Sequence, residues 1–196
     1  MRTASVNVYQ FGELSDKAKE KAREWYRSCI DSSDYDATEE DCKTIAKMLG
    51  IEEPTLYWSG FCSQGDGACL IGKWRSTDVD VEKLKEHAPK DEHLHNIAAR
   101  IEAFKHEGDH DGDYLTCKIT HRGHYYHERS TDFEFENEPE DFDSDEFEAA
   151  MIELNRWCYK QLEEQDRWLH SDENVDECIE ANEYEFTEDG KLWTRE

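Results

Sequence analysis

The segment from His106 to Asp113, HEGDHDGD, has residue types that could bind a metal ion. Its potential ligands are His106, Asp109, His110, Asp111 and Asp113. The three aspartates alternate like the first ligands of a calcium loop. The match then fails, because Gly112 comes one position early and the twelfth position is Thr120 where Glu is needed. The two histidines could instead hold a transition metal. An ordinary polar loop is the alternative that these mismatches favour, so we predict no metal or other cofactor.

Histidines and cysteines offer two further candidates. Five histidines crowd one part of the chain: His106, His110, His121, His124 and His127. On alternating strands they need not converge, which favours a surface cluster titrating at about pH 6.5 over a site. Cys62 and Cys69 flank a turn and could face each other, as a disulfide or a nucleophile. A nucleophilic cysteine needs a neighbouring base, and the sequence supplies no recognisable one. We therefore expect no catalytic residues and no enzyme.

The glycine-rich turn SQGDG, residues 63–67, is the centre of the least charged stretch, Tyr57 to Trp74. Its backbone N–H groups could face an anion. It lacks the lysine and the following helix of a phosphate-binding loop. The simpler interpretation is that glycine permits positive φ in a tight turn. This stretch is therefore predicted to be a β-hairpin at the centre of a sheet.

Acidic residues are the most unusual feature of the chain. The net charge is −26, from 49 acidic and 23 basic residues. Residues 134–148 include nine acids and residues 172–189 another nine, without lysine or arginine in either run. Such a charge repels nucleic acid and anionic membranes and favours a cationic partner. General acidic bias and simple solubility are the competing explanations.

Carboxylates in regular rows could take the place of phosphates. An extended run would place Glu134, Glu136 and Glu138 on one face, about 6.6 Å apart. A helix would place Asp172, Asp176, Glu180 and Glu183 in one stripe, although like charges at this spacing are unfavourable. We predict two groups of partner-binding residues. The first is Glu134, Glu136, Glu138, Glu140, Asp141, Asp143 and Asp145, and the second is the helical stripe.

The periodicity of apolar residues predicts an α+β fold, an antiparallel sheet of hairpins packed with about five helices. The predicted strands are 5–11, 56–61, 68–74, 114–120 and 125–136, with a terminal hairpin at 184–186 and 191–193. Helices are predicted to follow Ser15, near 38–49, at 79–87, 91–105 and 145–170, and at 172–182 after Ser171 as N-cap. Residues 51–54 are predicted to be a connection. We expect a single domain over 1–196, or two lobes with an acidic linker near 137–144.

Seven cysteines without a CxxC pair indicate free thiols in a reducing cytoplasm. No apolar segment follows Met1 as in a signal peptide, and no window could span a membrane. We therefore expect a cytoplasmic protein.

Three stretches carry a resemblance to a known family: LSDKAKEKAREWYR at 14–27, YWSGFCSQGDGACLIGKW at 57–74 and ECIEANEYEFTEDGKL at 177–192. The chain resembles, over nearly its full length, small bacteriophage and prophage proteins of unassigned function. Members are sometimes loosely labelled antitoxin-like. The resemblance implies a phage-encoded protein acting in the cytoplasm of the bacterial host cell. It transfers no catalytic residues.

These observations lead to one functional expectation with two alternatives. We expect an acidic inhibitor that binds a basic, nucleic-acid-binding host defence protein of the CRISPR or restriction type by mimicking nucleic-acid charge. It would bind neither nucleic acid nor membrane directly. The first alternative is an antitoxin-like protein that binds its partner through an apolar surface. The second is a metal-dependent enzyme or metal-binding protein that uses the 106–113 loop.

Overall fold

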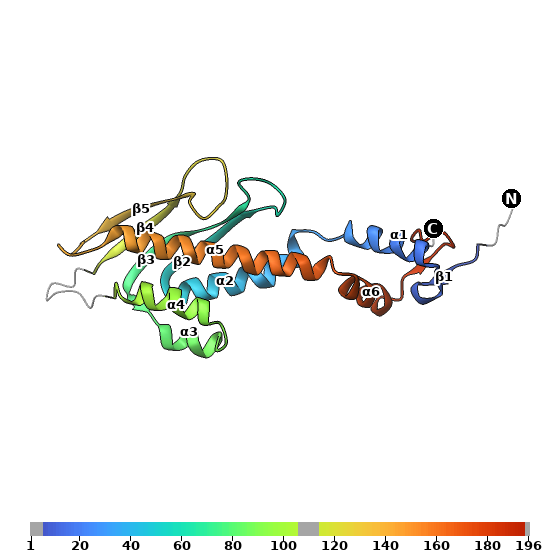
Figure 1. The fold of residues 1–196 in the computed structure, drawn as a ribbon, viewed down its shortest axis with the longest axis horizontal. Helices are drawn as coiled ribbons and strands as arrows, with labels where there is room; N and C mark the ends of the chain where they lie inside the picture. Colours follow the sequence, from blue (N-terminus) through green and yellow to red (C-terminus); the bar gives the residue numbers. More distant parts are fainter. Residues whose placement is uncertain (1–5, 106–113, 195–196) are drawn as a thin grey trace. The chain divides into compact units, whose positions relative to one another are not determined.

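The computed structural model describes residues 6–105 and 114–194, and the chain forms two compact units (Figure 1). Unit 1 combines Met1–Tyr35 with Glu164–Glu196, and unit 2 is Asp36–Glu163. The predicted α+β class is confirmed, since helices accompany antiparallel sheets. Residues 137–144, predicted as a linker between lobes, lie inside unit 2, and a unit boundary falls within the long helix α5, Ser144–Leu169.

Unit 2 is built on an antiparallel sheet of four strands. In spatial order they are β2 (Leu49–Ser59), β3 (Gly67–Val79), β4 (Thr116–His121) and β5 (Thr131–Glu136). The β2–β3 hairpin confirms the hairpin predicted for the Tyr57–Trp74 stretch and is longer than predicted, but β2 is an edge strand, so the hairpin does not lie at the centre of the sheet. Its central register pairs Leu56 with Leu70 and Tyr57 with Cys69. Because side chains alternate along a strand, the two leucines lie on the opposite face from Tyr57 and Cys69.

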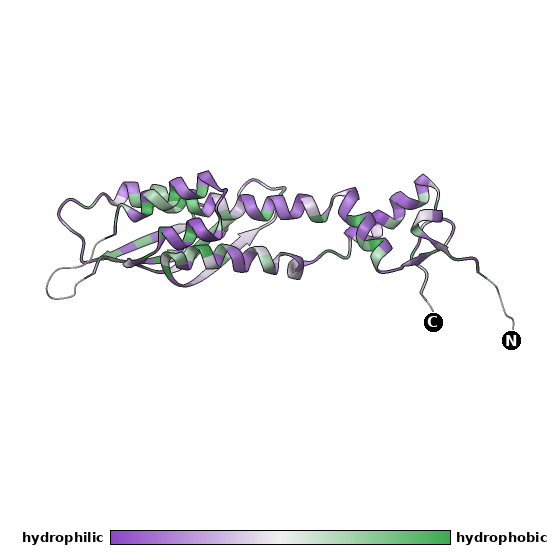
Figure 2. Ribbon diagram, turned by 90° about the horizontal axis from the view of Figure 1, so that it is seen from below, coloured by the Kyte–Doolittle hydropathy of each residue, from purple (hydrophilic) through white to green (hydrophobic). Residues whose placement is uncertain are grey.

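Helices cover the apolar face of this sheet (Figure 1). They are α2 (Asp36–Met48), α3 (Val81–His87), α4 (Glu92–Glu102) and α5. In α4, the predicted apolar positions Leu94, Ile97 and Ile101 are all buried. Asp91 caps α4 by accepting the N–H of Leu94 at 2.8 Å. The colouring by hydropathy shows the same pattern, with apolar stripes on the helices of unit 2 (Figure 2).

Aromatic packing closes the core of unit 2. Phe147 of α5 is fully buried and its ring centroid lies 4.7 Å from that of Trp74 on β3. Four other phenylalanines surround it. We refer to Phe104, Phe133, Phe135, Phe142 and Phe147 as the phenylalanine cluster. Leucine, isoleucine and valine are scarce in the chain, so these rings supply much of the buried apolar area.

Unit 1 packs two helices against a small antiparallel sheet. Its elements are β1 (Tyr9–Gln10), the 3₁₀ turns Phe11–Glu13 and Ser32–Tyr35, α1 (Asp16–Arg27), α6 (Asp172–Ala181) and β6 (Glu185–Phe186). The predicted N-caps are confirmed, because the side chains of Ser15 and Ser171 accept N–H groups of the first helical turn. The buried core contains Phe11, Ala18, Ala22, Val175, Ile179 and Phe186.

Four boundary predictions need correction. Within residues 6–11 only Tyr9 and Gln10 form a strand, and they pair with β6. The expected terminal hairpin is a single bridge between Phe186 and Leu192. Residues 51–54 belong to β2, where the register shifts between Glu52 and Thr55. The strand predicted over 125–136 begins only at Thr131, because the preceding residues form a loop with its own hydrogen bonds, including Ser130 N–H to His127 O at 2.9 Å.

Gly190 permits the C-terminal turn to lie against the backbone of α1. Its φ is +82°, and a Cβ atom there would be 2.1 Å from the carbonyl oxygen of Ala18. We predict that Gly190→Ala lowers the free energy of opening of unit 1 by more than about 2 kcal/mol, from both strain and overlap. Hydrogen exchange of α1 and α6 amides measures this loss.

Gly123 provides the matched control for that substitution. Its φ is +84°, but nothing lies within 4 Å of the added Cβ. Gly123→Ala therefore imposes a similar backbone strain without the overlap, and its effect on β4 and β5 amides should be about 1 kcal/mol. Equal losses for the two variants would show that the contact with Ala18 contributes nothing.

Candidate functional site

The run from residue 134 to residue 148 alternates acids that face solvent with phenylalanines that face the core, and we refer to it as the acidic edge. Phe135, Phe142 and Phe147 are its internal anchors. The ring of Phe142 lies 4.9 Å from Phe135, 6.2 Å from Phe147 and 5.5 Å from Phe104. The acids on either side of Phe142, Asp141 and Asp143, are exposed. Apolar packing therefore holds an exposed row of carboxylates in place.

Glu134 and Glu136 lie on the solvent-facing side of the sheet, as predicted from their alternation along β5. Basic residues accompany them there. Glu134 is paired in register with Lys118, whose Nζ is 3.4 Å from its carboxylate, and Lys118 is in turn paired with Lys73. Glu136 accepts the hydroxyl of Thr116 at 3.2 Å. This face of the sheet therefore carries mixed charge, which weakens the field of these two glutamates.

Of the acids that follow β5, Glu146 pairs with Nε of Arg100 at 2.7 Å, and four others have no such compensation. Glu138, Glu140, Asp141 and Asp145 are exposed, and no ion pair joins them to any residue in 6–105 or 114–194. Glu138 lies past the end of β5, so it does not extend the row of the two strand glutamates. Asp143 has a structural role, because its carboxylate accepts the N–H of Glu146 at 3.0 Å and caps α5. Glu138, Glu140, Asp141 and Asp145 are therefore the uncompensated acids of the acidic edge.

The pKa values of Cys117 and Glu148 show that the carboxylates of the acidic edge lie close to one another. Burial raises the pKa of the Cys117 thiol on β4 to about 12, and the charges of Glu148, Glu134 and Glu138 add to that rise. Desolvation raises the pKa of Glu148 above its ordinary value, Asp145 and Asp132 raise it further, and the cation of Arg122 acts against them. The acids of β5, of the following segment and of the first turns of α5 therefore share one field. Glu148 belongs to the acidic run seen in the sequence but was not among the predicted partner-binding residues, and Asp132 lies before that run.

The predicted stripe on α6 faces the basic side of α1. Arg23 binds both carboxylate oxygens of Asp176, at 2.6 and 2.7 Å. Arg27 pairs with Asp172 and donates to the backbone oxygen of His170 at 3.0 Å. The attraction to Asp176 raises the pKa of Arg23. Two members of the stripe are therefore neutralised within unit 1 by arginines of α1.

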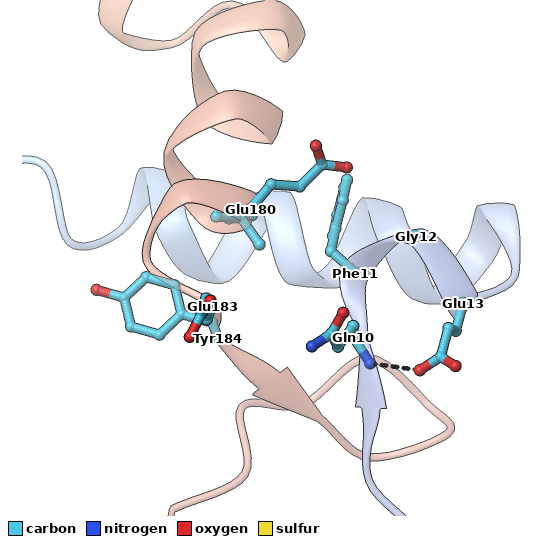
Figure 3. Close-up of a pocket in the computed structure, with 8 residues that line it drawn as sticks. Gln10, Phe11, Gly12, Glu13, Glu180, Glu183 and Tyr184 are labelled. Atoms are coloured by element: carbon cyan, nitrogen blue, oxygen red, sulfur yellow. Dashed lines mark hydrogen bonds between the residues drawn. The ribbon is translucent and has the colours of Figure 1, made fainter.

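The other two members of the predicted stripe line a pocket of unit 1 (Figure 3), but only Glu180 is on α6: the helix ends at Ala181, and Glu183 lies in the following turn with φ +53°. This cavity of about 310 Å³ lies between the turn after β1 and the end of α6. Its lining residues are Gln10, Phe11, Gly12, Glu13, Ile179, Glu180, Glu183 and Tyr184. Three carboxylates surround aromatic and aliphatic surface, although Glu13 also accepts the N–H of Gln10 at 2.8 Å. Charge and shape suit a cationic side chain better than an anion.

Other predicted sites are placed as follows. The potential metal ligands at 106–113 lie outside the described residues, and the remaining described histidines, cysteines and acids form no cluster of three suited to a metal ion. In the turn at 63–67, Asp66 accepts the N–H groups of Cys62 and Ser63 at 3.0 and 2.6 Å. The carboxylate of Asp66 thus takes up backbone N–H groups of this turn that could otherwise face an external anion.

All seven cysteines are free thiols. Cys62 is exposed in the loop, whereas Cys69 is buried in β3, where burial raises the pKa of its thiol to about 11. The two residues form no disulfide. Cys29 of unit 1 is also exposed, and Cys178 is partly buried. Among the histidines, the ring centroid of His121 lies 4.8 Å from that of Tyr126, while His124 and His127 line a separate cavity.

Comparison with known proteins identifies a family. A model described as a domain of unknown function, DUF8835, matches residues 35–172. The chain belongs to this family. The match covers all of unit 2, including the acidic edge, and ends at Asp172, the first residue of α6. No curated protein and no solved structure matches the chain significantly. Within the described residues, every helix is too short or too polar to cross a lipid bilayer.

The raised pKa of Glu148 leads to a prediction about stability and pH. Its ordinary pKa is 4.5, and the fold raises it, so the folded chain binds this proton more tightly than the unfolded chain. Ionised Glu148 therefore reduces stability above its folded pKa, and this cost disappears below about pH 4. Glu148→Gln should stabilise unit 2 by a few tenths of a kcal/mol at pH 7 and by nothing at pH 4.

Thermal unfolding at the two pH values, at low and high salt, measures this effect. Salt screens the repulsion and should reduce the gain at pH 7. Glu86→Gln on α3 is the control, since Glu86 is exposed away from the edge. An equal gain for both variants would contradict a local effect at the acidic edge.

The contact between Arg23 and Asp176 leads to a prediction for unit 1. The two side chains are only 19% and 30% exposed, so loss of either leaves a partly buried charge unpaired. Arg23→Gln should reduce the free energy of opening of α6 by about 1–2 kcal/mol. Lys17→Gln, an exposed change on the same helix, should alter it by less than 0.5 kcal/mol or so. A double-mutant cycle with Asp176→Asn should show coupling, and strict additivity would refute the pairing.

Proposed function

We propose that this chain is a non-enzymatic, phage-encoded inhibitor that binds a basic host protein through the acidic edge. The partner is a nucleic-acid-binding defence protein of the CRISPR or restriction type, and binding takes place in the cytoplasm of the bacterial host cell. Carboxylates take the positions that phosphates occupy in the partner's natural ligand. The observation that carries this proposal is the run of exposed acids interspersed with phenylalanine anchors, of which Phe147 is buried and Phe135 and Phe142 are partly buried.

Preorganisation is what makes this arrangement suited to binding. A flexible acidic tail loses conformational entropy when it binds, whereas groups held by a packed core have already lost it. Phe142 fixes the backbone between Glu140 and Asp143 by packing against three other rings. The fixed carboxylates also retain a repulsion that a cationic partner would relieve, because Asp145 and Asp132 add to the desolvation that raises the pKa of Glu148. Relief of that repulsion adds to the affinity for a basic groove.

The four uncompensated acids are better candidates than the α6 stripe. Asp172 and Asp176 would have to release Arg27 and Arg23 before they could bind a partner. Glu138, Glu140, Asp141 and Asp145 have no internal cation to release among the described residues. Glu134 and Glu136 fall between these cases because Lys118 and Thr116 contact them.

A partner-binding protein with an apolar contact surface is the second candidate. Tyr125 is 65% exposed, and Tyr57 is 37% exposed while its ring stacks on Tyr126 at 5.0 Å. Such aromatic groups are frequent at protein interfaces. Binding through them would depend only weakly on salt, which separates this candidate from the first.

The test compares two variants that lose the same charge. In the first, Glu138→Gln, Glu140→Gln, Asp141→Asn and Asp145→Asn remove the uncompensated acids and leave the cap Asp143. In the second, Glu82, Glu86, Glu92 and Glu102 of α3 and α4, all exposed, are changed to Gln. Immobilised wild-type protein should retain proteins from a bacterial lysate that duplex DNA and about 0.5 M salt release.

The edge variant should lose at least tenfold in affinity for those proteins, while the control variant loses less than threefold, as expected for charges outside the contact. Circular dichroism establishes that both variants fold. If neither salt nor DNA releases the retained proteins, the mimicry of nucleic acid is contradicted and the aromatic surface is favoured. Equal losses for both variants would show that net charge alone, and not the edge, determines binding.

A further inference from the structure

The loop that joins β4 to β5, residues 122–130, lines a cavity of about 290 Å³ whose chemistry is opposite to that of the rest of the chain. The lining residues are Arg122, Gly123, His124, Tyr125, His127, Arg129 and Ser130. None is acidic, although the chain carries 49 acids. We propose that this cavity, the basic loop site, binds the phosphate group of a small phosphate ester. This inference is independent of the proposed inhibitor function.

The loop is held in place by contacts at several points. Arg122 N–H donates to Ser130 O at 3.0 Å and closes the loop at its base. The side chain of Asn155 on α5 donates to Glu128 O at 3.3 Å and accepts the N–H of Leu70 at 2.9 Å, which ties the loop to β3. Gly67 of β3 has no side chain, and a Cβ there would be 2.6 Å from that of His127. The cationic groups are therefore mounted on a fixed backbone.

Two residues that line the cavity, His127 and Ser130, each keep a hydrogen-bond donor that a ligand can use. The backbone N–H of Arg129 donates to Nδ1 of His127 at 3.1 Å, so the neutral ring carries its proton on Nε2. Ser130 is 5% exposed, and its oxygen accepts the N–H of His127 at 3.3 Å. Its hydroxyl hydrogen has no acceptor among the described residues. An oxyanion could accept from both groups and from Arg129 at once.

The acids nearest the loop have partners within the protein. Glu128 does not line the cavity: its Oε1 accepts from Arg156 through Nε and Nη2, both at 3.2 Å, and its Oε2 lies 3.5 Å from Nδ1 of His127. Asp132 accepts one N–H of Arg122 at 2.8 Å, and the remaining donors of that guanidinium are left for a ligand. Arg129 is exposed and pairs with no acid in the described parts of the chain. Its planar group suits bidentate binding of phosphate.

Two features favour a small ester over a nucleic acid strand. The net charge of −26 repels a polyanion along its whole length, whereas one phosphate needs only the local field. Tyr125 is 65% exposed at the same cavity. Its ring packs beside Gly65, where an added Cβ atom would be 3.5 Å from it. Its outer face can pack against an apolar or flat part of the ester. A volume of about 290 Å³ is at the lower end of the range for small-molecule sites.

The test titrates full-length protein with inorganic phosphate and with a nucleoside monophosphate, at constant ionic strength. Calorimetry and NMR of the histidine rings should show saturable binding, with shifts at His124 and His127. Arg129→Gln should weaken binding at least about tenfold, because a charge-assisted contact is lost. Arg122→Gln with Arg129→Gln should weaken it further. The matched control, Lys83→Gln with Lys90→Gln, removes two exposed charges outside the cavity and should change affinity less than about twofold.

Each outcome decides the proposal. Tighter binding of the monophosphate than of inorganic phosphate, lost in Tyr125→Ala, supports an ester as ligand. Equal affinities for both probes would reduce the proposal to a site for free phosphate. Tighter binding of a single-stranded oligonucleotide would overturn the small-molecule assignment. A linear, unsaturable response, or equal losses in the arginine and lysine variants, would overturn the site altogether. Lysate retention by the acidic edge is a separate measurement, so failure of either proposal leaves the other standing.

Discussion

The side chain of Phe147 is the point at which α5, the sheet and the acidic edge meet. It packs on Trp74 of β3 and lies at the centre of the phenylalanine cluster. Residues 137–143 form neither helix nor strand, and this packing, together with a hydrogen bond from the Asn137 side chain to Tyr114 O, holds them beside β5. The most acidic run of the chain is thus positioned by its most apolar side chains. Burial of each such ring contributes about 1.5–3 kcal/mol, which offsets repulsion of a few tenths per acid pair.

Charge is distributed differently in the two units. In unit 1, α1 supplies arginines that neutralise part of α6, so the acids there help to fold the unit. In unit 2, basic residues occupy the middle strands of the open sheet face and the β4–β5 loop, while Glu138, Glu140, Asp141 and Asp145 after β5 remain uncompensated. The formal net charge is therefore a poor guide to local chemistry. An acidic edge and a basic cavity exist within the same unit because each is built by a separate segment.

Local patterns made most of the fold predictable. The caps Ser15 and Ser171, the apolar spacing of α4 and the β2–β3 hairpin all follow from neighbouring residues in sequence. Contacts between distant segments were not accessible in this way. Alternation favoured a strand at residues 125–130, and the approach of Gly67 to His127 and the bond from Asn155 favour a loop instead.

In the candidate site, too, local features were predictable from the sequence and contacts between distant segments were not. Exposed carboxylates along the 134–148 run follow from alternation of Phe and acid. The neutralisation of Asp176 by Arg23 joins residues 153 positions apart, which no periodicity reveals. The same reason explains why the effect of Asp132 on Glu148 was not predicted, and why the residues of the basic loop site stood out in the sequence only as several nearby histidines.

The unequal exposure of the cysteines has a practical consequence. Thiolates are the reactive form, and burial holds the thiols of Cys69 and Cys117 protonated at neutral pH. Cys42 and Cys158 are fully buried between α2 and α5. Exposed thiols remain at Cys29 in unit 1 and at Cys62 in unit 2. The unmodified chain thus carries one natural attachment point for a fluorophore or spin label in each of its two units.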